Sequence, residues 1–413
     1  MKMLLLLLFP FVLFAQTYGL RTLIREAEKE NPMIRSKMMD VNAKAEEINA
    51  AKSDFWPTVD ISAGSVKSNP VTLVDPGVTT SASALIGVDL YDGGRRKAVL
   101  DAKRFEHTAS LFEKRAFEKS VALNIINSYY AVKKYKATLF ALQKRSHELQ
   151  TQIDRIRRFI VAGLSTEEEL DRLSAAYDNN AYSIENTKLA IVEAEERLSL
   201  QSGLRVRGLK ENHIREPRHV RYEAYEKSKI LHAHAQAMKE NAKAAGSGYL
   251  PQVSLSDSFT ASHYTNTEEV PGLTGLLQQQ QNYLILKVNM RLFDKGKIKN
   301  EQEALKYRKL SLESQKIYAD QEQKMHFRVA AKRLKTLRAK LKSTKSGLKA
   351  SRSTYRAIRK KYEAGMVDNV TYLDALTQVT LSMARYKETL YDYEVAKSIY
   401  YYYAGKSPRE YIQ

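Results

Sequence analysis

Two long stretches of this chain lack the residues that normally end helices. No Pro or Gly occurs in residues 95–160, and Gly347 is the only one in residues 297–362. Apolar residues recur at helical spacing in the first stretch, for example at Phe105, Ala109, Phe112 and Ala116. At about 1.5 Å per residue, each stretch can form a helix about 100 Å long. Such helices suit a coiled coil, a bundle or a tube better than a compact globular core.

The two stretches belong to an internal repeat. The phrase IGVDLYDGGRRK at residues 86–97 returns as VNMRLFDKGKIK at residues 288–299, 202 positions later. The same offset relates Gly203 to Gly405, whereas upstream matches are offset by 194 to 195 positions. The common order of these matches predicts an internal duplication with a longer loop between the strands of the second copy. We place repeat 1 at residues 16–204 and repeat 2 at residues 205–413.

Each long helix is expected to turn back on itself. The breaks are Ala162-Gly163-Leu164 and Ala364-Gly365-Met366, and the returning helices are predicted at roughly residues 166–202 and 368–404. Gly163 and Gly365 fit the C-cap position of a helix, where a left-handed residue is favoured. We interpret them as the tip turns of two helical hairpins.

Two strand candidates precede each long helix. In residues 282–293, NYLILKVNMRLF, the apolar Leu286 and Val288 alternate with the polar Lys287 and Asn289. Alternation of this kind predicts strands with one apolar and one polar face. A soluble sheet packed on the helices and a sheet inserted in a membrane both fit it.

Aromatic residues favour the membrane interpretation. The first strand of each pair follows an aromatic residue and a Pro, and the second strand ends on an aromatic residue. The residues concerned are Phe55, Trp56, Tyr91, Tyr249 and Phe293. In two hairpins these places lie at one level, which is the geometry of an interfacial aromatic girdle.

The N-terminus indicates export. MKMLLLLLFPFVLFAQ combines one Lys, an apolar run and the small residue Ala15. The run is too short to span a bilayer and has the layout of a secretory signal peptide. We predict a signal peptide at residues 1–15, with cleavage after Ala15 or, alternatively, after Gly19.

Composition argues against several other functions. The net charge of +20 is spread along the helices, which indicates solvated helix faces rather than a nucleic-acid partner. The absence of Cys excludes disulfides and thiolate metal sites. AGKS at residues 404–407 lacks the strand and first Gly of a P-loop, and His232 and His234 point to different sides of a helix. We predict no enzymatic activity, no cofactor and no metal.

Four strands cannot enclose a pore. The smallest membrane barrels have about eight strands, and open sheet edges are not tolerated in lipid. Two copies of the chain would supply eight strands, and three would supply twelve, enough for a lumen that admits water and solutes. We therefore expect a homotrimer.

The sequence with these features resembles the outer-membrane efflux protein (TolC-like) family. The resemblance covers nearly the whole mature chain. It lies in Asn31-Pro32, the two strand starts, the LYDGG and LFDKG turns, and the tip phrases IVAGLSTEEELDRL at 160–173 and YEAGMVDNVTYLDALTQ at 362–378. It implies a mainly α, internally duplicated fold, in which long antiparallel helices form a trimeric α-barrel in the periplasm. Each chain adds four strands to a shared twelve-stranded β-barrel in outer-membrane lipid.

The resemblance also implies a function. The channel would passively export drugs, small molecules or proteins in a multi-component efflux or type I secretion system. Its partners would be a periplasmic adaptor (membrane fusion protein) and an inner-membrane transporter, whose docking opens the helix tips. The alternative is a soluble periplasmic coiled-coil adaptor or structural protein.

Finally, the resemblance implies a gate at the tips. The two acidic residues that the family shows after the second tip Gly align with Thr371 and Asp374, so one of them is replaced here. The acidic tip residue of the first repeat aligns with Glu169, and the tip tyrosine is Tyr362. We expect the closed tips to be held by polar contacts among Glu169, Asp374, Tyr362, Arg157 and Arg158.

Overall fold

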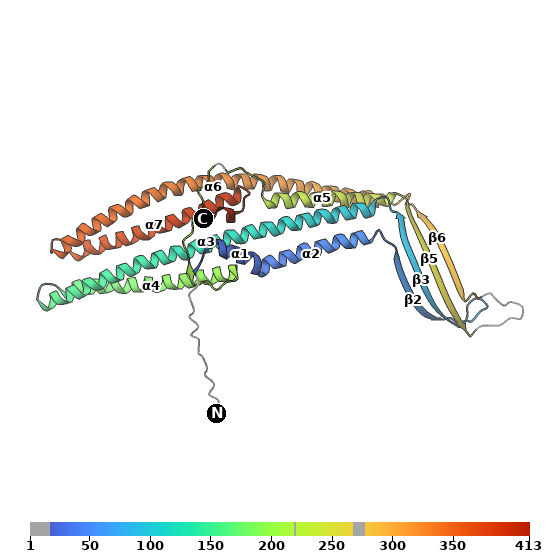
Figure 1. The fold of residues 1–413 in the computed structure, drawn as a ribbon, viewed down its shortest axis with the longest axis horizontal. Helices are drawn as coiled ribbons and strands as arrows, with labels where there is room; N and C mark the ends of the chain where they lie inside the picture. The colour runs from blue at the N-terminus through green and yellow to red at the C-terminus, as the bar shows by residue number, and fades with distance from the viewer. Residues whose placement is uncertain (1–16, 219, 267–276) are drawn as a thin grey trace, which may run out of the picture. The chain divides into compact units, whose positions relative to one another are not determined.

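The computed structural model describes residues 17–218, 220–266 and 277–413 (Figure 1). The predicted signal peptide, residues 1–15, lies outside the described residues. The chain divides into two compact units, unit 1 with residues 1–37, 114–226 and 320–413, and unit 2 with residues 38–113 and 227–319. Each unit takes segments from both predicted repeats, because the long helices run through both units.

The order of a helix, two strands and two long helices occurs twice, whereas α1 has no helical counterpart in the second half. The helices are α1 (Leu20–Glu30), α2 (Pro32–Ser53), α3 (Arg95–Val161), α4 (Glu167–Ser202), α5 (Glu226–Gly246), α6 (Lys297–Glu363) and α7 (Asn369–Tyr403). The strands are β1 (Thr17–Tyr18), β2 (Thr58–Lys67), β3 (Val78–Tyr91), β4 (Gly208–Leu209), β5 (Gln252–Thr265) and β6 (Gln280–Asn289). Short 3₁₀ helices cover Ser247–Tyr249 and Pro408–Tyr411.

The predicted long helices and tip turns are confirmed. Helices α3 and α6 each have 67 residues, and they begin and end at positions 202 apart. Gly163 and Gly365 have φ of 71° and 72°, a left-handed conformation that Gly adopts without a Cβ penalty. The amide of Leu164 donates to the carbonyl of Phe159 over 2.7 Å, which closes the end of α3.

The repeated phrase forms the passage from strand to helix. In the first copy, the carboxylate of Asp92 accepts hydrogen bonds from the amides of Gly94 (3.1 Å) and Arg96 (2.8 Å). In the second, Asp294 accepts from Gly296 (2.9 Å) and Ile298 (2.9 Å). Each Asp therefore satisfies amides at the start of a long helix that have no partner within the helix.

Unit 2 contains one antiparallel sheet with the strand order β2-β3-β5-β6. Its register places on one face the apolar residues Val59, Ile61, Ala63, Ala82, Ala84, Ile86, Val88, Val253, Leu255, Phe259, Ala261, Leu284, Leu286 and Val288. The polar residues Asp257, Gln280 and Asn282 also lie on this face, as do Ser65, Lys67, Thr80, His263 and Thr265 toward the end of the sheet away from the helices. The other face is mainly polar, with Ser62, Ser83, Thr260 and Gln281 in one cross-strand row. The apolar face is not covered within the chain, since Ile61 is 82% exposed and Leu284 is 71% exposed.

The fourth strand is shorter than the sequence predicted. Strand β6 ends at Asn289, so Met290 to Phe293 lie beyond the sheet. Its pairing partner β5 begins at Gln252, which pairs with Asn289. The preceding residue is Pro251, whose nitrogen has no hydrogen to donate to a further strand pair.

Unit 1 has its largest core around α1. Leu20, Leu23 and Ile24 pack with Ile125 and Ile126 of α3, and all five are nearly inaccessible to solvent. A two-stranded parallel pair, β1 with β4, lies beside this core. In the part of the chain that the structure describes, no helix is both long and apolar enough to cross a membrane.

Candidate gate at the helix tips

Four helices of unit 1 lie in the order α4, α3, α7, α6 (Figure 1). The amide nitrogen of the Asn180 side chain donates to the carbonyl of Leu142, which joins α4 to α3. Lys134 of α3 lies 2.7 Å from Glu388 of α7, which joins the two hairpins. Ser351 of α6 and Ser382 of α7 share a hydrogen bond of 2.9 Å. Away from the tips, helices α3 and α7 are therefore the inner pair, and α4 and α6 are the two edges.

The predicted Tyr362 and Glu169 meet at the tips of the two hairpins. The hydroxyl of Tyr362 donates to Oε1 of Glu169 over 2.6 Å. The other carboxylate oxygen of Glu169 accepts a hydrogen bond of 2.7 Å from Ser165. The ring of Tyr362 is 6% exposed and stacks on Tyr372 with the centroids 4.6 Å apart. The hydrogen bond from Tyr362 to Glu169 thus joins the two hairpins, and the stacking of Tyr362 on Tyr372 packs α6 against α7 within the second hairpin.

Burial keeps the Tyr362 hydroxyl protonated. Desolvation raises the pKa of Tyr362 well above its ordinary value, and the hydrogen bond to Glu169 raises it further. A protonated phenol donates to a carboxylate in a charge-assisted hydrogen bond, which is stronger than one between neutral groups. The Tyr362 hydroxyl therefore remains a hydrogen-bond donor throughout the neutral pH range.

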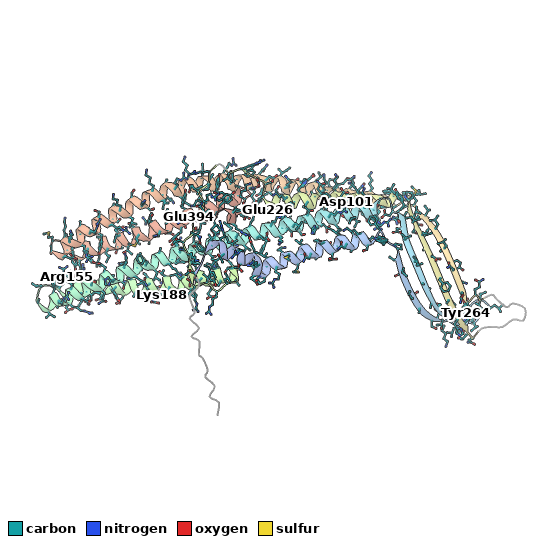
Figure 2. All side chains as sticks on the ribbon, viewed as in Figure 1. Asp101, Arg155, Lys188, Glu226, Tyr264 and Glu394 are labelled. Carbon is teal, nitrogen blue, oxygen red and sulfur yellow. The ribbon has the colours of Figure 1, made fainter. Side chains whose placement is uncertain are left out.

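Arg155 completes this contact, although the sequence did not single it out. Its guanidinium lies 5.6 Å from the ring centroid of Tyr362 and 4.9 Å from that of Phe159. It also donates to the main-chain carbonyl of Glu363 over 2.6 Å, from α3 to the end of α6. Figure 2 shows Arg155 near the turn between α3 and α4. Its four-residue spacing from Phe159 was the available signal, because residues i and i+4 share a helix face.

The basic pair Arg157 and Arg158 occupies a different side of α3. Both side chains are exposed, and Arg157 lies 4.0 Å from Asp154 one turn back. In the described chain, neither of these arginines contacts Tyr362 or Glu169. One residue of a helix is rotated by about 100° from the next, so Arg155 and Arg157 cannot point the same way.

A second polar layer lies one turn further from the tip. The hydroxyl of Tyr372, which is fully buried, donates to Oε1 of Glu148 over 3.1 Å. Arg359 lies 3.3 Å from the same carboxylate and 2.9 Å from Glu363. Desolvation raises the pKa of Tyr372 far above its ordinary range, so this hydroxyl also remains a donor. The two layers together connect α3, α6 and α7.

Asp374 is separate from both layers. Asp374 and Thr371 are exposed and lie three residues apart on one side of α7. The amide of Thr371 donates to Asp368 over 2.8 Å, and Asp368 thereby caps the start of α7. The structure therefore groups Glu169 with Tyr362, and among the described residues exposed Asp374 makes no hydrogen bond or ion pair with either of them.

A cleft of about 570 Å³ lies between the two tip turns. Arg155, Glu169, Tyr362, Asp368 and Asn369 are among the residues that line it. Asn369 is itself buried, and its side-chain nitrogen lies 3.4 Å from the main-chain oxygen of Glu169. Separation of the hairpins would therefore break a small number of defined polar contacts at one place.

The five predicted girdle residues lie at one end of the sheet in unit 2. They flank the start of β2, the end of β3, the start of β5 and the segment after β6. Trp56 is 74% exposed and Phe293 is 84% exposed, and Phe55 and Tyr91 are also exposed. Tyr249 is half-buried and donates to Asp294 over 2.9 Å, so it supports the second strand-to-helix turn.

The fold is that of known outer-membrane channels. CusC is 17% identical, with 95% of each chain covered and a TM-score of 0.81. VceC from Vibrio cholerae is 14% identical, covers 94% of this chain and 96% of its own, and has a TM-score of 0.80. The Campylobacter jejuni outer-membrane channel CmeC is also 14% identical, covers 94% of this chain and 86% of its own, and has a TM-score of 0.80. A search of curated protein sequences found no match.

The sequence profile of outer membrane efflux proteins matches residues 23–204 and 229–398, one block in each repeat. The chain belongs to the outer membrane efflux protein family. It is an outer-membrane channel for efflux, with long helices that extend into the periplasm, as the resemblance implied. The alternative of a soluble periplasmic adaptor is not supported. The members of this family are channels and not enzymes.

Proposed function

We propose that three copies of this chain form one efflux channel, which opens at the helix tips when an adaptor and an inner-membrane transporter dock. The sheet of unit 2 is the observation that carries the proposal. It has an uncovered apolar face and a mainly polar face, and within the described residues β2 and β6 each pair on one side only. Sheet edges of this kind require pairing partners in lipid.

Three copies would pair β6 of each chain with β2 of the next. The closed twelve-stranded barrel would direct Leu284, Leu286 and Val288 to lipid and Lys287 to a water-filled lumen. The aromatic residues at one end of the sheet would then lie at the membrane interface, where aromatic side chains are favoured. Phe55, Trp56, Tyr91 and Phe293 are exposed in the single chain, as such a role requires.

The tips supply the gate of the proposed channel. Tyr362, Glu169 and Arg155 hold one hairpin against the other within each chain. A partner that binds the separated hairpins more tightly than the joined ones would shift the channel toward its open state. Asp374 would face the lumen, so that three copies would place three carboxylates near the constriction.

The proposal is tested by isolating the protein from membranes. We expect detergent to be needed for extraction, native mass spectrometry to give three chains, and the purified protein to form conducting channels in planar lipid bilayers. Recovery as a single chain from the soluble periplasmic fraction would contradict the proposal. Co-purification with an adaptor, lost when the tip turns are deleted, would test the proposed partner.

A further inference from the structure

The two edge helices of unit 1 carry opposite charges. Residues 323–362 of α6 include 15 Lys and Arg residues and no Asp or Glu. Helix α4 contains nine acidic residues and three basic ones. Figure 2 labels Arg155 and Lys188 on the same hairpin as α4. Away from the tips the inner pair α3 and α7 lies between these edges, whereas at the tips Tyr362 of α6 contacts Glu169 of α4.

Part of this charge is arranged in columns. On α6, Lys335, Lys342 and Lys349 lie seven residues apart, and all three are exposed. Each directly follows one of the leucines Leu334, Leu341 and Leu348, which lie on the side of α6 that packs toward α7. Residues seven apart lie on one side of a helix, so the three lysines form one column.

Helix α4 carries the matching acidic column. Asp171, Asp178 and Glu185 are also seven residues apart and exposed. Glu185 has a local contact of 2.7 Å with Lys188, and its side chain nevertheless remains 70% exposed. Among the described residues, none of the three column lysines of α6 forms an ion pair with its own chain.

The duplication shows how the two columns would meet. Helices α3 and α7 form an antiparallel joint in which Lys134 contacts Glu388 and Glu148 contacts Tyr372. Adding the repeat offset of 202 to a residue number of α3 gives its counterpart in α6, and subtracting 202 from a residue number of α7 gives its counterpart in α4. The equivalent joint therefore sets Thr336 of α6 opposite Asn186 of α4, and Ala350 of α6 opposite Leu170 of α4. Within one chain α6 and α4 meet at the tips, where Tyr362 contacts Glu169, and not in this register. The helix α6 of one copy can instead reach α4 of the next.

We propose that α6 of one copy binds α4 of a second copy through three ion pairs, Lys335 with Glu185, Lys342 with Asp178, and Lys349 with Asp171. Lys335 directly precedes Thr336, and Glu185 directly precedes Asn186. Lys349 precedes Ala350, and Asp171 follows Leu170. The middle pair lies seven residues from each of the others on both helices. All three pairs share one antiparallel register, which is that of Ala350 opposite Leu170. The pair Thr336 and Asn186 is offset from it by two residues.

The contact between α3 and α7 inside the chain has no such row of three ion pairs. The residues equivalent to the three proposed pairs are Lys133 with Lys387, Phe140 with Thr380, and His147 with Leu373. Lys133, Phe140 and Lys387 line one groove between α3, α6 and α7. The proposed contact between copies would thus hold three pairs of opposite charge, whereas the equivalent positions within a copy include the like charges Lys133 and Lys387.

Cysteine crosslinking tests the three proposed ion pairs, and the natural chain contains no Cys that would interfere. The reporter carries Thr336→Cys and Asn186→Cys and is treated with a short bismaleimide in detergent. Because the inference rests on the proposed assembly, native mass spectrometry of the same sample reports the number of chains separately. We expect crosslinked dimers and trimers whose yield falls as NaCl is raised, since salt screens exposed charges.

Charge reversal and charge exchange give the decisive comparison. We expect Asp178→Lys to lower the crosslinked fraction about two- to fivefold, as the loss of one exposed ion pair supports. Addition of Lys342→Asp to the same chain should restore it, and Lys342→Asp alone should lower it. Trimers whose crosslinked fraction does not change with salt, charge reversal or charge exchange would overturn the three proposed ion pairs and leave the proposed assembly intact. A reporter protein that remains a single chain would overturn the ion pairs together with the proposed assembly.

Discussion

Tyr362 and Glu169 are 193 residues apart in the sequence, and their side chains are joined by a hydrogen bond of 2.6 Å. The contact joins the end of α6 to the first turn of α4, and hence one hairpin to the other. A hydrogen bond to a charged group contributes about 1.5–3 kcal/mol. Three copies in one channel would repeat it three times, which makes this contact the first target for a change in gating.

Removal of the Tyr362 hydroxyl should favour the open tips. We expect Tyr362→Phe combined with Glu169→Ala to raise the single-channel conductance in planar bilayers, because the direct contact between the hairpins is lost. The matched control is Tyr182→Phe on α4, where the side chain is 71% exposed. An unchanged conductance in the double variant would remove both residues from the gate.

Arg155 should matter more than its neighbour Arg157. Arg155→Ala removes the contact with the Tyr362 ring, for which about 0.5–1 kcal/mol is typical at an accessible site. We expect this variant to open more readily, and Arg157→Ala to behave like the natural protein. The measurement is the fraction of time that single channels are open. The reverse ranking would support the basic pair that the sequence suggested and exclude Arg155.

Helix periodicity explains why the sequence predicted the elements better than their contacts. The 3.6-residue repeat and the scarcity of Pro and Gly located α3 and α6, and the two-residue alternation located the sheet faces. Which arginine meets Tyr362 depends on the rotation of α3 relative to α6, and that rotation is set by tertiary packing in the cluster around Tyr362 and Tyr372. Similarly, β6 ends where its antiparallel partner β5 begins, which the sequence of β6 alone does not encode.

Thr371 and Asp374 should control the interaction with cations. Both are exposed on one side of α7, and Thr371 stands where the family resemblance led us to expect an acid. We expect Asp374→Ala to weaken block by multivalent cations, because the proposed constriction would lose three carboxylates. Thr371→Glu should strengthen the block by adding three. Block that is the same in both variants would place this side of α7 outside the lumen.

Glu47 should make unit 2 sensitive to acid. Its carboxylate lies 2.8 Å from Lys103 and from Lys44, so it joins α2 to α3. Hydrogen bonds from Lys103 and then Lys44 hold the pKa of Glu47 below its ordinary value of 4.5. A lowered pKa in the folded state contributes stability that is complete above the unfolded value and is lost as pH falls through the folded value.

We therefore expect the denaturation midpoint of the natural protein to fall as pH is lowered from about 5 toward 3, the range in which glutamate titrates. Glu47→Gln should be less stable near neutral pH and show a shallower fall. Glu46→Gln is the control, because Glu46 makes no ion pair in the described residues. Parallel curves for Glu47→Gln and the natural protein would show that Glu47 does not contribute to the acid dependence.

Neighbouring residues of β6 give the sharpest test of the sheet register. Val288 lies on the apolar face beside Val253, and Asn289 lies on the opposite face beside Gln252. A charge on the lipid side of a membrane strand costs about 2–4 kcal/mol near the bilayer midplane and less near its surface. We expect Val288→Arg to reduce the yield of trimers on semi-native gels and Asn289→Arg to assemble like the natural protein, because its charge would meet water. The same substitution thus tests two adjacent positions that differ only in the face they occupy. Equal yields would mean that the apolar face does not meet lipid, and the assignment of the two faces would have to be abandoned.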